Sequence, residues 1–136
     1  MIPIVSVIGY DKEAKTAAVT ALVKEMTGRG YRVGTIKHHV HNDFEIDVPG
    51  KASHKHREAG ASEVAIASPT MLAYIRTHAS DPMLVDVAAM FSPDIDIIIT
   101  EGYAAADTYK VESPVKNVEA AADAIEKEFL KDKDGG

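Results

Sequence analysis

An eight-residue segment near the start of the chain constrains its fold more than any other feature. Gly9-Tyr10-Asp11-Lys12-Glu13-Ala14-Lys15-Thr16 follows an apolar, β-branched run and precedes residues with helical periodicity. The segment fits the phosphate-loop pattern G-x-x-x-x-G-K-[ST] except at Ala14, which replaces the second glycine. In such loops backbone N–H groups bind phosphate, the lysine reaches the terminal phosphates and the threonine hydroxyl helps to hold Mg²⁺. The segment therefore predicts a phosphate site; an ordinary turn with a lysine and a threonine is the alternative.

Ala14 bears on how tightly such a site binds. Its β-carbon enters a space where the backbone and a phosphate approach closely. If this position requires a positive φ angle, the strain adds roughly 1–2 kcal/mol. At the centre of that range the loss of affinity is about tenfold. The substitution therefore predicts weakened rather than abolished nucleotide binding.

The rest of the chain alternates strands with helices. Strands are predicted at residues 2–8, 31–37, 63–67, 95–100 and 109–111. Helices are predicted from Lys15 to about Gly28, over residues 53–58 with Ser53 as cap, after the cap Asp81, and from Val118. Residues 71–77 fit either a strand or a helical turn. This order predicts an α/β fold of the P-loop NTPase type, a three-layer sandwich around a mainly parallel sheet. We expect one nucleotide-binding domain over residues 1–130 and a frayed tail over 131–136.

Charge and composition limit the classes of partner and the kinds of chemistry that can be expected of the chain. The net charge of −6 argues against nucleic-acid binding, and no apolar run is long enough for a membrane helix. The chain has no cysteine, which excludes disulfides and thiolate chemistry. Without a signal-peptide pattern, the default expectation is a soluble cytoplasmic protein. Residues 29–57 carry six Lys and Arg against three acidic residues, so this stretch is either an anion-binding island or a solvated basic loop.

Glu101 is the second candidate site residue. It directly follows the most strand-like run of the chain, which contains three consecutive isoleucines. In doubly wound sheets the carboxyl ends of the strands line the ligand crevice. An acid there can hold Mg²⁺ through water or orient an attacking water, whereas Asp96 fits the entrance of the strand. A solvated acid at the end of a strand is the alternative for Glu101.

Taken together, these segments resemble the MobB family of molybdopterin-guanine dinucleotide biosynthesis proteins. The match runs through most of the chain in order and spacing. Its segments are the loop before Lys15-Thr16, Gly30-Tyr31-Arg32-Val33-Gly34-Thr35-Ile36-Lys37-His38-His39, Phe44-Glu45-Ile46-Asp47, Pro49-Gly50-Lys51, Ser53, His56-Arg57, Ala59-Gly60-Ala61, Ala67-Ser68-Pro69, Ile99-Thr100-Glu101-Gly102-Tyr103 and Tyr109-Lys110-Val111-Glu112.

The resemblance implies a GTP-binding homodimer that assists molybdenum (or tungsten) cofactor maturation beside a guanylyltransferase and the molybdoenzymes that receive the cofactor. It implies at most a slow GTPase. By position, Lys15 and Thr16 would contact phosphate and Mg²⁺, and Asp47 and Glu101 would lie on the metal or γ-phosphate side. The other nucleotide contacts would come from Gly9, Tyr10, Asp11, Lys12, Glu13, Ala14, Lys37, Lys51, Ser53, Arg57 and Gly102.

The chain departs from the family pattern at three functional positions. Alanine occupies positions 14, 52 and 104, and the chain lacks one strand before the final helix. These alanines favour an alternative, a pseudo-NTPase that docks a partner protein or a pterin cofactor without nucleotide. A third hypothesis is a metal site of imidazoles, because five of the six histidines lie at positions 38–56, among them His39, His41, His54 and His56.

Overall fold

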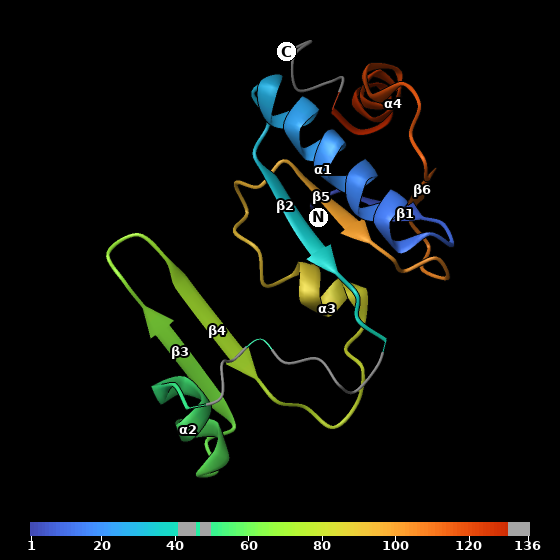
Figure 1. Ribbon diagram of the computed structural model, residues 1–136. Helices are drawn as coiled ribbons and strands as arrows, with labels where there is room; N and C mark the ends of the chain where they lie inside the picture. The colour runs from blue at the N-terminus through green and yellow to red at the C-terminus, as the bar shows by residue number, and fades with distance from the viewer. Residues whose placement is uncertain (41–45, 47–49, 131–136) are drawn as a thin grey trace. The chain divides into compact units, whose positions relative to one another are not determined.

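The structure of the protein is a computed structural model that describes residues 1–40, 46 and 50–130 (Figure 1). The chain divides into two compact units. Unit 1 combines Met1–His38 with Pro82–Gly136, and unit 2 is His39–Asp81.

Unit 1 is built on a four-stranded parallel sheet. Its strands are β1 (Ile4–Ile8), β2 (Val33–Lys37), β5 (Ile97–Glu101) and β6 (Tyr109–Glu112), in the order β2-β5-β1-β6. Every residue of β5 is buried, which explains its uninterrupted isoleucines: both faces of a parallel strand are covered. The predicted parallel sheet is therefore confirmed, with strands that start up to two residues later than predicted.

Helices cover both faces of this sheet. Helix α1 (Lys12–Gly28), helix α4 (Val118–Ile125) and the π-helical turn Glu126–Leu130 pack on one face, around a core that includes Leu22, Met26 and Ile125. The short helix α3 (Leu84–Ala88) packs on the other face with Ile36 and Ile98. Figure 1 shows α1 and α4 on the same side of the sheet. The predicted three-layer α/β sandwich is confirmed.

In its described residues, unit 2 contains one helix and one hairpin. Helix α2 (Ala52–Glu58) precedes strands β3 (Glu63–Ala67) and β4 (Leu72–Arg76), which pair antiparallel with Val64 opposite Ile75. Residues 71–77 are thus mainly strand, because β4 finds its partner in β3. Val64 is the buried residue of this hairpin, and most of its other side chains are exposed.

Three predicted helix starts are wrong. Helix α1 begins at Lys12 rather than Lys15, because the Asp11 carboxylate accepts a hydrogen bond from the Glu13 N–H and caps the helix early. Helix α2 has Lys51 at its N-cap position rather than Ser53. Helix α3 starts after Met83 rather than after Asp81. Neither Lys51 nor Met83 makes a side-chain capping bond, so tertiary packing places these two starts.

A single domain over residues 1–130 stays a prediction, and residues 131–136 lie outside the described part. None of the helices in the described ranges has the length and apolar character needed to cross a membrane.

Candidate functional site

The parallel register brings two predicted site residues to the same edge of the sheet. Lys37 ends β2 and Glu101 ends β5, and the two lie opposite each other in the ladder. Glu101 also lies opposite Val7 near the end of β1, just before the loop that leads into α1. Carboxyl ends of parallel strands lie at a common edge, so the start of α1 lies at the same place.

Two side chains converge there on one carboxylate oxygen of Glu101. Thr16, in the second turn of α1, donates from Oγ1 to Glu101 Oε2 at 3.0 Å. The Lys37 Nζ atom donates to the same Oε2 at 2.5 Å. The side chain of Glu101 is 9% exposed, whereas that of Lys37 is 51% exposed. The sequence-predicted residues Thr16, Lys37 and Glu101 therefore form one cluster, in which the acid is buried and the ammonium is half-exposed.

This environment keeps Glu101 ionised. Burial by itself would raise the pKa of Glu101. The hydrogen bonds from Lys37 and Thr16, together with the positive charges of Lys37 and Lys15, outweigh burial and lower the pKa below its usual range. At neutral pH the site therefore offers a buried anion facing two lysines.

The turn after β5 has an unusual backbone. Gly102 has a φ of 106° and donates its N–H to the Val7 carbonyl at 3.0 Å. A β-carbon on Gly102 would also lie 3.3 Å from His38 Cβ. Tyr103 follows with a φ of 64°, rare for a bulky residue, and its ring stacks on His38 at 4.3 Å between centroids. Strain of this kind is typical of functional turns and persists only where surrounding contacts, such as the stack on His38, hold the backbone in place.

The predicted phosphate loop has a compact conformation. Gly9, with a φ of 150°, lies so close to Ser113 that an added β-carbon would be 2.2 Å from the Ser113 hydroxyl oxygen. Ala14 lies inside α1 and has no positive φ, so the strain expected at that position does not arise. The Lys15 N–H donates to the Asp11 carbonyl at 3.0 Å as part of the helix. Tyr10 is fully exposed, and Lys12 and Glu13 are exposed in the first turn.

The donor set suits magnesium. Mg²⁺ prefers hard oxygen ligands, and protein sites commonly supply one or two while water and phosphate supply the rest. The Thr16 hydroxyl and the ionised Glu101 carboxylate, already 3.0 Å apart, provide two such oxygens. These residues fit the ion that the phosphate-loop pattern implies.

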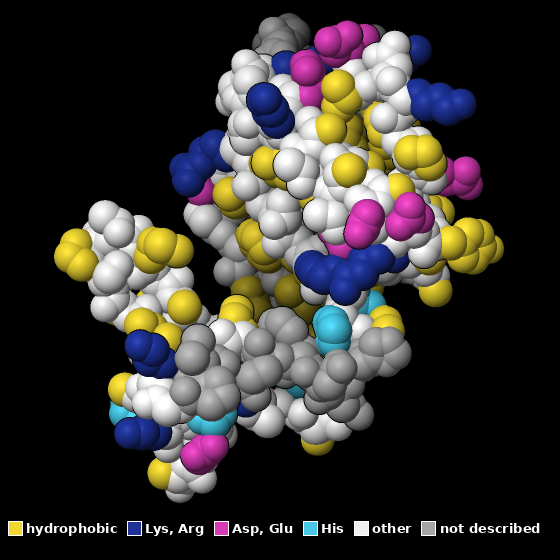
Figure 2. Space-filling model, in the orientation of Figure 1, with side chains coloured by type: hydrophobic (Ala, Val, Ile, Leu, Met, Phe, Trp, Pro, Cys, Tyr) yellow, Lys and Arg dark blue, Asp and Glu magenta, His cyan; other side chains and the backbone are white. Residues whose placement is uncertain are grey.

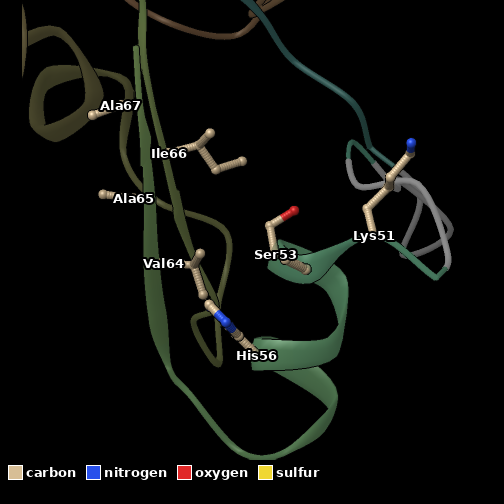
Figure 3. Close-up of a pocket in the computed structure, with 8 residues that line it drawn as sticks. Lys51, Ser53, His56, Val64, Ala65, Ile66 and Ala67 are labelled. Carbon is tan, nitrogen blue, oxygen red and sulfur yellow. The ribbon is translucent and has the colours of Figure 1, made fainter.

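Other predicted residues lie in unit 2. Lys51, Ser53 and His56 line a groove of about 450 Å³ between α2 and β3, with Val64 and Ile66 on the strand side. Figure 3 shows Ser53 and His56 between the helix and the strand, and Lys51 farther from the strand. Arg57 lies on the same helix. The predicted metal ligand Asp47 lies outside the described residues.

The described histidines of the 38–56 stretch belong to no metal-binding group. In the part of the chain that the structure describes, no group of three or more His, Asp or Glu side chains is arranged to hold a metal ion. His41 is not among the described residues. His54 instead pairs with Glu58 one helical turn later, at 3.2 Å.

Sequence reasoning missed two features of this site. The stack of His38 on Tyr103 was not foreseen, although the Gly102-Tyr103 pair directly after a buried strand is a signal for a sharp turn. The contact of Ser113 with Gly9 joins residues from opposite ends of the chain, and no local pattern indicates it.

Comparisons with known proteins identify the family of the chain. The family model of "Molybdopterin guanine dinucleotide synthesis protein B", MobB, matches residues 4–130, which is nearly the whole chain. The chain belongs to the MobB family. The resemblance seen in the sequence is thereby confirmed.

Individual MobB relatives support this assignment. The molybdopterin-guanine dinucleotide biosynthesis adapter protein of Haemophilus influenzae is 35% identical over 104 residues, covering 75% of this chain and 57% of the relative. The protein of the same name from Escherichia coli is 33% identical over 107 residues, covering 76% and 60%. The crystal structure of Bacillus subtilis MobB shares the fold with a TM-score of 0.68 at 24% identity, covering 89% of this chain and 73% of that one. The chain thus spans about three fifths of the length of these two curated MobB relatives.

Proposed function

We propose that this MobB-family chain is a GTP-binding accessory protein in the biosynthesis of the molybdenum cofactor, with slow or no hydrolysis. The contact of Thr16 with Glu101 carries the proposal. It joins the threonine of the phosphate-loop pattern to an acid at the end of the neighbouring strand, the arrangement in which a Mg²⁺-nucleotide is held. Lys15, one residue earlier on the same helix, supplies the positive charge for phosphate.

Glu101 is better suited to hold a metal than to take a proton. A general base works best when its pKa is close to the working pH. The pKa of Glu101 is lowered because the hydrogen bonds and charges around the carboxylate outweigh its burial. When Mg²⁺ is bound, the ion would neutralise phosphate charge, and Thr16 and Glu101 would hold it directly or through water. A weak base at this position would support at most slow hydrolysis.

Calorimetry with Mg-GTP and Mg-ATP tests the proposal. Lys15→Ala should abolish the heat of GTP binding, since it removes the ammonium that reaches the phosphates. Lys24→Ala is the matched control, because Lys24 is an exposed lysine farther along the same helix. If the wild type binds neither nucleotide, or if Lys15→Ala binds as the wild type does, the proposal is wrong.

A second function is favoured by the early start of α1. The Asp11 carboxylate already occupies the helix N-terminus, where an anion such as phosphate would otherwise bind. This arrangement favours a pseudo-NTPase that docks a partner protein or a pterin without nucleotide. Under this alternative, millimolar Mg-GTP and Mg-ATP leave the melting temperature unchanged, whereas a ligand at 100 times its Kd should add about 2.7 kcal/mol of stability.

The proposed partners are a guanylyltransferase of cofactor maturation, the molybdoenzymes it serves and a second copy of this chain. The hairpin of unit 2 supports the homodimer. Met71, Leu72, Tyr74 and Ile66 are between 45% and 76% exposed on it, and Figure 2 shows hydrophobic side chains at this hairpin. Exposed apolar side chains gathered on one element are typical of an interaction surface.

A further inference from the structure

Lys37 is the cation that neutralises the Glu101 carboxylate in the cluster. It is paired with Glu101 by the register of β2 and β5, so its side chain leaves the sheet next to the carboxylate. Its Nζ lies 2.5 Å from Glu101 Oε2, the oxygen that also accepts from Thr16. The ammonium therefore shares one oxygen with the threonine of the phosphate-loop pattern.

A divalent cation at the same place would meet this ammonium. Mg²⁺ lies roughly 2.0–2.1 Å from its oxygen ligands. A metal held by both Thr16 and Glu101 would take Oε2, the oxygen that faces Thr16, and would therefore stand close to the Lys37 ammonium. At such separations two positive charges repel strongly, more so beside a side chain that is only 9% exposed. The ion and the ammonium therefore compete for Glu101.

We propose that Lys37 holds Glu101 in place of a divalent cation, as a positioning residue that the ion must displace. This inference rests on the proposed metal-nucleotide site and assigns it a binding order. The 51% exposure of the Lys37 side chain leaves its flexible stem room to move away from Glu101. The displaced ammonium adds its charge to that of Lys15, where a triphosphate needs it. The free protein thus binds Mg²⁺ poorly, and a nucleotide favours its entry.

Titration of the nucleotide-free protein with Mn²⁺ tests this directly. Mn²⁺ takes the same oxygen ligands as Mg²⁺ and is counted by its electron paramagnetic resonance signal. Lys37→Gln should bind Mn²⁺ at least about tenfold more tightly than the wild type, because a positive charge beside the ion is gone. The double variant Lys37→Gln with Glu101→Gln should lose this gain. Lys24→Gln, which removes an exposed charge elsewhere, should bind like the wild type.

Lys37→Met, which keeps the length of the stem, repeats the measurement if the glutamine variant unfolds. The proposal is overturned if neither variant binds Mn²⁺ more tightly than the wild type. The titration contains no nucleotide, so its outcome is separate from that of the proposed function. If GTP binds but Mn²⁺ affinity does not respond to Lys37, only this inference fails. If Mn²⁺ affinity responds but neither GTP nor ATP binds, only the nucleotide proposal fails.

Discussion

At the scale of single residues, Asp11 serves the fold in a way that opposes phosphate binding. Its carboxylate caps α1 through the Glu13 N–H at 3.1 Å. Asp11→Ala should lower the free energy of unfolding by about 1 kcal/mol, the usual effect of losing a cap. The same change should tighten binding of inorganic phosphate or GTP, because a competing negative charge leaves the helix N-terminus. Urea denaturation and calorimetry measure the two effects.

Asp107→Ala is the matched control for Asp11→Ala, since Asp107 is an exposed acid in a loop away from this helix. It should change neither quantity. An Asp11→Ala variant with unchanged anion affinity would show that the helix N-terminus takes no part in ligand binding.

Glu101 predicts a particular dependence of stability on pH. Its folded-state pKa lies below the ordinary value of 4.5, so the ionised carboxylate stabilises the fold above that pH. This contribution is lost as the pH falls through the folded-state pKa. Glu101→Gln should therefore be less stable than the wild type by about 1 kcal/mol at pH 7, and the difference should shrink below pH 4.5. Urea denaturation at several pH values measures it, and a constant difference would contradict the prediction.

The residues of the candidate cluster could be selected from the sequence, whereas the contacts among them could not. The pattern identified Lys15, Thr16 and Glu101, because strand ends and helix starts are local features of sequence. The bond from Lys37 to Glu101 depends on the register of two strands far apart in the chain. Ala14 is unstrained because Asp11 starts the helix early, a competition that a motif does not show.

At the scale of secondary-structure elements, Arg29 ties helix α1 to helix α4. Its guanidinium pairs with Glu25 on its own helix, with Asp123 on α4 and with Glu126 just after it, at 2.7–2.9 Å. Tyr31 also donates to Glu126 at 2.7 Å. These contacts link the C-terminal end of α1 to α4 and to the turn that follows α4.

Arg29→Ala should destabilise the protein by about 1–3 kcal/mol, because bonds to charged groups are lost at a side chain that is only 21% exposed. Arg32→Ala is the control, since Arg32 pairs with Asp94 where both side chains are more than half exposed. It should have the smaller effect. Chemical denaturation of both variants measures the two losses of stability. Equal losses would show that the Arg29 cluster stabilises the protein no more than the exposed Arg32–Asp94 pair does.

The elements that the sequence predicted best are those with a local signal. The isoleucines of β5 are enough to predict a buried strand, and the helical periodicity of α1 is enough to predict a helix. The sequence of residues 71–77 fits a strand as well as a helical turn, because the strand forms only through pairing of β4 with β3. The caps predicted at Ser53 and Asp81 were wrong because packing places those helix starts, and no capping bond is made.

At the scale of the whole molecule, the two units should differ in stability. Unit 1 contains most of the buried side chains, including the whole of β5, whereas the hairpin of unit 2 buries Val64. Native-state hydrogen exchange should show that amides of β3 and β4 open at lower free energy than those of β1 and β5. Equal protection in both units would contradict this and favour one cooperative domain.

The proposed homodimer makes a prediction for unit 2. If the exposed residues of the hairpin pair two copies, Leu72→Lys should shift the protein toward monomer, because a charge replaces an apolar contact. Val40→Lys, at another exposed apolar residue, is the control. Sedimentation velocity measures the masses, and a Leu72→Lys variant that associates as the wild type does would remove the hairpin from the interface.

The insertion of unit 2 between the two parts of unit 1 also has a consequence for synthesis on the ribosome. Strand β1 is made before unit 2, whereas both of its partners, β5 and β6, are made after unit 2. The hairpin of unit 2 pairs neighbouring residues and can form as soon as it emerges. Strand β1 must therefore stay unpaired while the whole of unit 2 is translated, which exposes its apolar residues to chaperones and to aggregation in the nascent protein.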